Sequence, residues 1–409
     1  MHVPVWHEGT AGWVKDGKLV VLGVTQEQHA DRCRLLAQWK GFDWPILHDP
    51  INVLESLAVP ILVAIDEHGI VRSTKPMLAN FKADFLDRKF ADDAKGAAPR
   101  HVTPALKKDT GQPDWDALRA QAKKTDSADV WRALGDALVL WGSDKTLDEA
   151  MSSYEHAAKI EPKNGPAWFR LGVCNRRRYE SAHPQSGDFQ SAIDHWGKAL
   201  DLDPNQYIWR RRIQQYGPRL DQPYSFYDWV TQAEKAIRAH GAEPIALTGR
   251  PAGAEIAYPI KTLPSAAAAR APDPDGKILR DVGGLILAEV TVVPGQVRAG
   301  KSARIHVVLR PNPKLKAHWN NEAEPLRLWV ESPKGWQVSD RLLTANIPKK
   351  AVTEELRTLT FEVIAPADAS GKQRLSLYAL YNVCNDGDAQ CQFLRLDVRV
   401  DIAIQRSTP

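Results

Sequence analysis

The chain has no long apolar run, no strong excess of charge and no leader peptide at its start. Because no stretch of 18 or more residues is apolar, the sequence predicts no membrane span. The formal net charge of +4 is spread thinly, so we expect no nucleic-acid partner. Without a basic, apolar and small-residue leader, the chain as it stands is expected in the cytoplasm. It would be extracytoplasmic if the true start lay upstream and carried a signal.

Cysteine is scarce, and its spacing excludes the common metal sites. The chain has 4 cysteines. No Cys-x2-Cys or His-x3-His spacing with ligand geometry occurs, although His48 and Asp49 form a ligand-like pair. We therefore predict no bound metal and no cofactor. Cys174 occupies a small-residue position of a predicted helix, so it is assigned no chemistry.

Strand and helix signals alternate through the first part of the chain. In order, they are a buried strand at 18–24, a helix at 26–39, a short strand at 42–49 and strands at 61–66 and 70–72. This order and spacing resemble a redoxin, the peroxiredoxin-type branch of the thioredoxin superfamily. The resemblance implies a thioredoxin-like domain over residues 1–90.

The motif that gives such domains their activity does not occur here. In the family, a first strand delivers a cysteine to a helix N-terminus, where the helix dipole lowers the thiol pKa. Residues 4–14 resemble the remainder of that helix, so the strand and its Cys-x-x-Cys or Thr-x-x-Cys segment would lie upstream. Either the true start is upstream, or the domain has lost its chemistry and serves as a structural module.

Two features of this block have candidate roles. The resemblance places Val59 and Pro60 where the superfamily has a cis-proline beside its substrate groove; the alternative is an ordinary trans proline that opens a strand. Cys33 lies beside Arg32 and Arg34 on the predicted helix. These cations would lower its pKa and make it a resolving or replacement thiol. The alternative is a small residue on a helix flank.

The middle block, 114–242, contains an internal repeat. A series of Trp, Leu-Gly, Ala, aromatic, Ala and Pro occurs twice. Its members are Trp131, Leu134, Gly135, Ala150, Tyr154, Ala157 and Pro162, then Trp168, Leu171, Gly172, Ala192, Trp196, Ala199 and Pro204. The series resembles the tetratricopeptide repeat, in which small residues let paired helices approach. Because two units leave apolar faces open, further helices are expected at 114–124, 207–216 and 226–240.

Arginine runs in the helical block are candidate contacts for a protein or peptide partner. They are Arg176, Arg177 and Arg178, followed by Arg210, Arg211 and Arg212. Clustered guanidinium groups hold carboxylates bidentately, and helical repeats present such groups to peptides. The alternative is a solvated helix face paired with nearby acids.

Linkers are predicted at 91–113 and, rich in proline and alanine, at 243–276. Beyond them, residues 277–409 alternate short strands and turns. The expected strands are 278–282, 285–293, 302–309, 326–330, 356–363, 373–383 and 393–404. This spacing suggests an immunoglobulin-like β-sandwich. An aromatic and polar loop with His318 and Trp319 either borders the last hairpin or is simply exposed.

The last hairpin contains a cysteine pair. Cys384 and Cys391 flank a turn signalled by residues 385–388, and residues opposed across a hairpin are close enough for a disulfide. The segment resembles the N-terminal domain of bacterial thiol:disulfide interchange proteins, and also the C-terminal β-domain of redoxin proteins with NHL repeats. The functional alternative is an exchangeable disulfide that passes electrons to a redoxin. The other alternative is a structural disulfide, or two thiols that have no role.

Together these features predict a multidomain chain with α/β, all-α and all-β parts. One hypothesis is a thiol:disulfide or peroxide-linked oxidoreductase with a helical-repeat connector and a thiol-redox partner, inactive at its first block as it stands. The other is a non-catalytic repeat scaffold with a degenerate thioredoxin-like domain.

Overall fold

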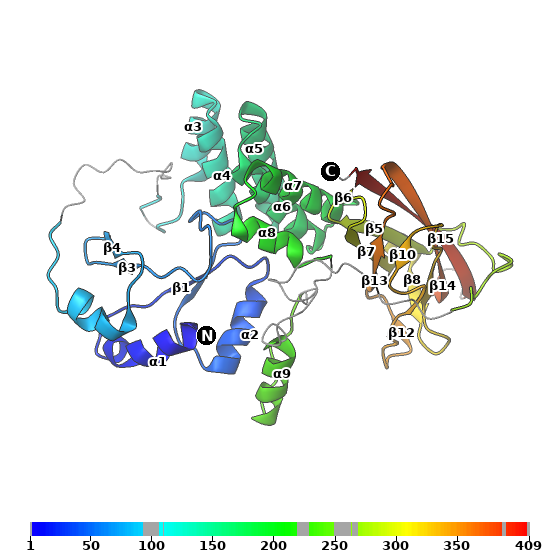
Figure 1. Cartoon of the computed structure of the whole chain (residues 1–409), viewed down its shortest axis with the longest axis horizontal. Coiled ribbons are helices and arrows are strands. Elements are labelled where there is room, and N and C mark those ends of the chain that lie inside the picture. The colour runs from blue at the N-terminus through cyan, green and yellow to red at the C-terminus, as the bar shows by residue number, and fades with distance from the viewer. Residues whose placement is uncertain are drawn as a thin grey trace. The chain divides into compact units, whose positions relative to one another are not determined.

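The computed structural model describes residues 2–92, 106–108, 110–218, 229–248, 263, 269–386 and 390–406 (Figure 1). Helices and sheets both occur, which confirms a mixed α/β, multidomain class. The chain divides into two compact units. Unit 1 comprises Met1–Ala182, Lys198–Arg212 and Asp228–Arg250, and unit 2 comprises His183–Gly197, Ile213–Tyr227 and Pro251–Pro409. Most of the two predicted linkers, 93–105 and 249–268 apart from residue 263, lies outside the described residues, and the predicted domain boundaries stay predictions.

The first part of unit 1 alternates short strands and helices. Its elements are α1 (His2–Lys15), β1 (Gly23–Thr25), α2 (Ala30–Lys40), β2 (Ile46–His48), β3 (Ala64–Ile65) and β4 (Val71–Ser73). β1 pairs with β2 in parallel, and β3 pairs with β4 antiparallel, so the described strands form two separate sheets. The strands predicted at 18–24 and 61–66 shrink to three and two residues, because each has a partner over only that length.

The helices that follow agree with the predicted helical block. They are α3 (Trp115–Thr125), α4 (Ala128–Trp141), α5 (Leu147–Ile160), α6 (Gly165–Tyr179), α7 (Asp188–Leu202), α8 (Tyr207–Gln214) and α9 (Trp229–Ala239). Local signals set where they begin: the side chain of Asp114 accepts from the backbone of Asp116 and Ala117, and that of Asn164 accepts from Ala167. These side chains satisfy backbone N–H groups that the first helical turn leaves without partners.

Close approach of α4 and α5 depends on a glycine. A Cβ atom at Gly135 would lie 2.6 Å from the ring of Tyr154, which is fully buried. The Tyr154 hydroxyl donates to Asp136 at 2.8 Å, and Arg170 pairs with the same carboxylate at 2.8 Å. The small residue and the aromatic residue of the repeat series therefore meet across one helix pair.

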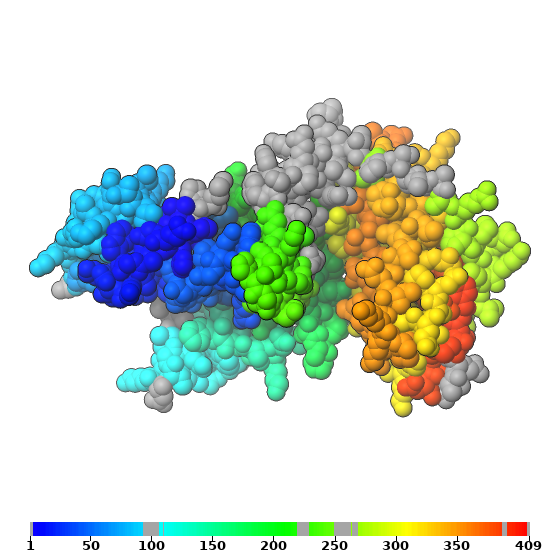
Figure 2. Space-filling model, turned by 90° about the horizontal axis from the view of Figure 1, so that it is seen from below, coloured from blue at the N-terminus to red at the C-terminus, as the bar shows by residue number. Residues whose placement is uncertain are grey.

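In unit 1, the first block packs against the helical block. Leu35 of α2 lies in one apolar cluster with Val230, Ala233 and Ile237 of α9. Figure 2 shows the green surface of α9 directly beside the blue surface of α2. Trp39 and Trp229 stack with ring centroids 6.5 Å apart. The two predicted blocks therefore share a core.

Unit 2 contains two sheets around one core. One has the order β10 (Gln337–Val338), β13 (Arg357–Ile364), β7 (Ser302–Pro311) and β5 (Ile286–Val293). The other has the order β11 (Leu342–Thr344), β9 (Arg327–Val330), β14 (Gly371–Asn385), β15 (Gln390–Gln405) and β6 (Gln296–Arg298), with β8 (Ala317–Asn320) on β14 and β12 (Val352–Thr353) on β8. Alternate residues of β7 point inward and are buried, as the period of a strand requires: Ala303, Ile305, Val307 and Leu309.

Most of the predicted strands of this unit coincide with observed ones. The exception is 278–282, which contains no strand; its Arg280 makes an isolated bridge to Arg395. Residues 269–278 instead cover the outer face of the larger sheet, where Ala271 and Ile278 pack on Trp329 and Tyr378. In 278–282 itself, Ile278 packs on this face, whereas Leu279 and Val282 are 73% and 95% exposed, so the apolar residues of this segment did not mark a strand.

Candidate redox site on the C-terminal hairpin

Cys384 and Cys391 lie directly opposite each other on β14 and β15. Their Cα atoms are 4.0 Å apart, and their sulfur atoms, 1.94 Å apart, form a disulfide. The ladder between the two strands runs from Gly371 and Ile404 to Asn385 and Gln390, so the pair sits near its open tip. Of the predicted turn, residues 387 and 388 lie outside the described residues.

The two cysteines differ in exposure. Cys384 is 6% exposed, whereas Cys391 belongs to the exposed residues. Both point away from the core, because the preceding residue Val383 and its neighbour Trp319 on β8 are fully buried in it. Of the two cysteines, Cys391 is therefore the one that solvent reaches more easily.

His318 and Asp386 complete the surroundings of the disulfide. In the ladder between β8 and β14, His318 is the direct partner of Cys384, so both side chains lie on the same face of the sheet. Nδ1 of His318 is 3.5 Å from Oδ1 of Asp386. The segment with His318 and Trp319, expected to be a loop, is the strand β8, and it borders the cysteine hairpin, which is one of the two alternatives from the sequence. Asp386 was identified only as a turn residue, because its contact with β8 joins residues 68 positions apart.

An aromatic side chain lies on the same face beside the disulfide. Phe393 follows Cys391 by two residues on β15 and is 39% exposed. Successive residues of a strand alternate between faces, so Phe393 and Cys391 face the same solvent. An exposed apolar side chain therefore lies next to the disulfide.

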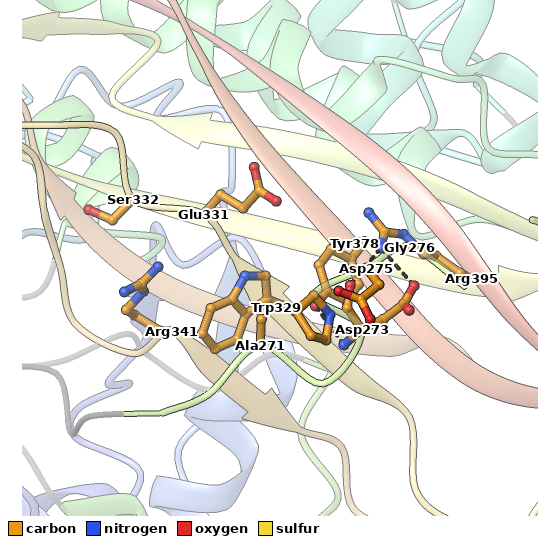
Figure 3. A pocket seen from close by; sticks show the side chains of 11 residues that line it. Ala271, Asp273, Asp275, Gly276, Trp329, Glu331, Ser332, Arg341, Tyr378 and Arg395 are labelled. Carbon is orange, nitrogen blue, oxygen red and sulfur yellow. Dashed lines mark hydrogen bonds and ion pairs between the residues drawn. The ribbon is translucent and has the colours of Figure 1, made fainter. Parts of the chain in front are cut away.

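A polar pocket of about 550 Å³ lies on this sheet, away from the cysteines (Figure 3). Trp329 and Tyr378 form part of its lining, and Arg395 pairs there with Asp273 at 2.8 Å. Tyr378 precedes Cys384 by six residues, which corresponds to about 20 Å along a strand. The pocket and the disulfide are therefore separate features of one sheet.

The other two cysteines lie in unit 1 and are shielded from solvent to different degrees. The Cys33 thiol donates to the Thr25 hydroxyl at 2.9 Å, and burial raises its pKa. Burial outweighs the opposing effect of Arg32, so the prediction that this pKa is lowered is wrong. Cys33 is therefore not an activated thiol. Cys174 is fully buried, and burial raises its pKa to about 12.

The peptide bond between Val59 and Pro60 is cis. Val59 is about half exposed, at 51%, and Pro60 is exposed as well. Among the described residues, no contact places Cys33 or Cys174 beside Val59 and Pro60. A role of this bond in a substrate groove stays a prediction.

Two of the six arginines are buried within unit 1. Arg212 is 1% exposed and donates to the carbonyl of Pro50 at 2.9 Å, to the carbonyl of Gln26 and to the side chain of Gln28. Arg176 is buried and pairs with Glu180 at 2.6 Å. Their predicted role in holding a peptide is replaced by internal contacts, because neither guanidinium group reaches the surface.

The remaining arginines lie nearer the surface. Arg177 pairs with Asp144 at 3.2 Å and Arg178 with Asp148 at 2.8 Å. Arg210 donates to the carbonyl of Pro204, and Arg211 lies 5.6 Å from the centre of the Tyr207 ring. For the first pair, this matches the alternative of a helix face neutralised by nearby acids.

The described residues contain neither a membrane-spanning helix nor a metal-binding cluster. None of their helices is long and apolar enough to cross a membrane. Over the same ranges, no group of three or more His, Cys, Asp or Glu side chains is placed to hold a metal ion.

Comparison with known proteins identifies no family. No family model matches the chain, and no curated protein matches it. AvmM, which catalyses macrocyclization in alchivemycin A biosynthesis, has a TM-score of 0.20 and 9% identity over 30% of this chain and 92% of its own. AggA, the major subunit of aggregative adherence fimbriae type I from Escherichia coli, has a TM-score of 0.17 and 12% identity over 29% and 95%. Neutral ceramidase from Pseudomonas aeruginosa has a TM-score of 0.15 and 9% identity over 59% and 36%. Similarities this low support no statement about fold or function.

Proposed function

We propose that this protein exchanges thiols and disulfides with a dithiol partner protein through Cys384 and Cys391. The observation that carries the proposal is the unequal exposure of the two cysteines of a disulfide at a hairpin tip: Cys391 is exposed, whereas Cys384 is 6% exposed. A disulfide with only a structural role does not require an exposed cysteine beside an exposed aromatic side chain.

The exchange has two steps. A thiolate of the partner attacks Sγ of Cys391, the disulfide bond breaks, and Cys384 leaves as a thiolate. The partner's second thiolate then attacks its own sulfur in the mixed disulfide and releases Cys391. The partner loses two electrons and becomes a disulfide, while the hairpin gains two electrons and two protons as a dithiol.

The remaining parts of the chain have supporting roles in this proposal. The first block is a thioredoxin-like module without a reactive cysteine among its described residues, and the helical block is a tetratricopeptide-like connector. The two-sheet unit is an immunoglobulin-like domain that presents the hairpin. Support for the connector role comes from the contacts of Arg212 and Leu35, which tie the first block to the helices.

Trapping of the mixed disulfide tests the proposal. Cys384→Ser leaves Cys391 as a single exposed thiol at the hairpin, and Cys391→Ser leaves only the shielded Cys384. With an oxidised thioredoxin-type protein, we expect Cys384→Ser to form the mixed disulfide at least about tenfold faster, because the rate depends on access to sulfur. The products are separated by non-reducing electrophoresis and identified by mass spectrometry.

A reduction potential measured in glutathione buffers decides between exchange and a staple. Exchange requires a potential within reach of the cellular dithiol proteins, above about −300 mV. A lower potential, or equal trapping of the two variants, would show that the disulfide is structural. The repeat scaffold would then be the remaining hypothesis.

A further inference from the structure

Three strands place a histidine beside the shielded sulfur of the disulfide. Cys391 on β15, Cys384 on β14 and His318 on β8 are consecutive partners in the two ladders, so they form one row across the sheet. Opposed residues of antiparallel strands have Cβ atoms about 4.5–5.5 Å apart. The imidazole is therefore within reach of the sulfur that the attack on Cys391 releases.

The position of His318 is held from two sides. Its neighbour Trp319 is fully buried and donates from its indole nitrogen to the carbonyl of Glu355 at 2.9 Å, which anchors β8. The backbone of Asp386 donates to the carbonyl of Lys316 at 3.4 Å, and its carboxylate lies 3.5 Å from Nδ1 of His318. The His318 side chain is only 13% exposed. The ring is thus confined to the side of the sheet that carries the disulfide.

We infer that His318, oriented by Asp386, is the proton donor to the Cys384 thiolate during thiol–disulfide exchange. This inference rests on the proposed function. When the partner's thiolate attacks Cys391, the bond between the two sulfur atoms breaks and its electron pair goes to Cys384. The imidazolium gives its proton to that sulfur, and the neutral imidazole takes it back when the dithiol is reoxidised.

The arrangement of Cys384, His318 and Asp386 contains the groups found around an activated thiol. A sulfur, a histidine and a carboxylate that orients the histidine are the parts needed to stabilise a leaving thiolate. A leaving thiol departs faster when its thiolate is stabilised. The charged groups near His318 are Asp386 after β14, Lys316 before β8 and Glu354 one residue beyond β12.

The test compares rates of disulfide reduction as a function of pH. The whole protein is reduced with dithiothreitol between pH 5 and 8, the range in which histidine side chains ordinarily change charge. His318→Gln and Asp386→Asn are the test variants. His156→Gln is the matched control, because His156 also faces an aspartate, Asp126 at 3.2 Å, but in unit 1 and away from any disulfide.

We expect His318→Gln to slow reduction about tenfold or more at the acid end of this range, since general acids contribute about 10²–10⁴ in rate. Its pH dependence should then follow only the thiolate fraction of dithiothreitol. Asp386→Asn should show a smaller loss of the same kind, and His156→Gln should match the wild type.

The outcomes separate this inference from the proposed function. If the wild type is reduced but His318→Gln and Asp386→Asn have the wild-type profile, the inference is wrong and the exchange function stands. If the wild-type disulfide resists reduction, both are wrong. Should His318→Gln lower the melting temperature, Asp386→Asn decides, because that carboxylate is 68% exposed and no part of the core.

Discussion

Gly135 is the position at which a single methyl group should disturb the helical block most directly. In Gly135→Ala, the new Cβ atom would lie 2.6–2.9 Å from three ring carbons of Tyr154. Tyr154 cannot yield easily, because its ring is fully buried and its hydroxyl is bonded to Asp136, which Arg170 also holds. The steric conflict must therefore move one helix relative to the other.

The magnitude follows from two opposing effects. Overpacking a core costs about 1–3 kcal/mol, whereas alanine is favoured over glycine in a helix by about 1 kcal/mol. We expect a net loss of up to about 2 kcal/mol in the free energy of local unfolding of α4 and α5. Gly197→Ala is the matched control: no atom lies within 4 Å of a Cβ atom built at Gly197 in α7, so alanine should stabilise there by about 0.5–1 kcal/mol.

Hydrogen exchange followed by mass spectrometry measures this effect locally, which matters because a chain with two units need not unfold in one step. Peptides from α4 and α5 should lose protection in Gly135→Ala, and peptides from α7 should gain it in Gly197→Ala. Unchanged or increased protection of α4 and α5 would refute the argument that Tyr154 and Gly135 set the spacing of this helix pair.

Three further predictions concern single side chains. His29 is buried, and burial together with Arg176 and Arg32 lowers its pKa from 6.5 to about 3. Between these two pH values the unfolded chain therefore binds one more proton than the folded chain. The free energy of unfolding should fall by about 1.4 kcal/mol per pH unit as the pH drops from 6.5 towards 3. In urea unfolding, His29→Gln should lack this dependence on pH. Phe393→Ser should raise the half-saturating concentration of a thioredoxin-type donor by about 5–30-fold, and leave the rate with dithiothreitol unchanged. Cys33 should react with iodoacetamide at least about tenfold more slowly than free cysteine at pH 8, because the thiolate is the reactive form; an equal rate would contradict its buried position.

Much of the fold was predictable where one element alone determines the pattern. The strands of unit 2 follow from period-2 burial, as in β7, and the helices from capping residues such as Asp114 and Asn164. The sequence pattern misassigned 278–282, where only Ile278 packs on the sheet, Leu279 and Val282 are exposed, and pairing is limited to one bridge between Arg280 and Arg395. Short pairing strands such as β8 and β12 were missed, because four or two residues give too few repeats of a period to be detected.

Part of the candidate site could likewise be predicted from the sequence, and part could not. Facing positions of Cys384 and Cys391 follow from their spacing around one turn, which is local information. Asp386 near His318 and the burial of Arg212 depend on strands and helices distant in sequence, and no local pattern encodes them. The arginine runs show the limit of local sequence patterns. Within one run of three arginines, Arg212 is buried and bonded inside unit 1, whereas Arg210 is exposed.

Part of the stability of the first block comes from the helices beside it. Val20, Leu22 and Val24 alternate as exposed apolar side chains, and Ile61, Val63 and Ile65 do the same. Two-stranded sheets that expose their apolar rows are marginal on their own. Several buried contacts of this block are with the helices: Leu35 packs on α9, the carbonyl of Ile51 accepts from Arg170, and that of Pro50 accepts from Arg212. Removal of the helical block would therefore expose these groups and destabilise the first block, which would keep only contacts of its own such as those of Phe81 with Trp6 and Trp13.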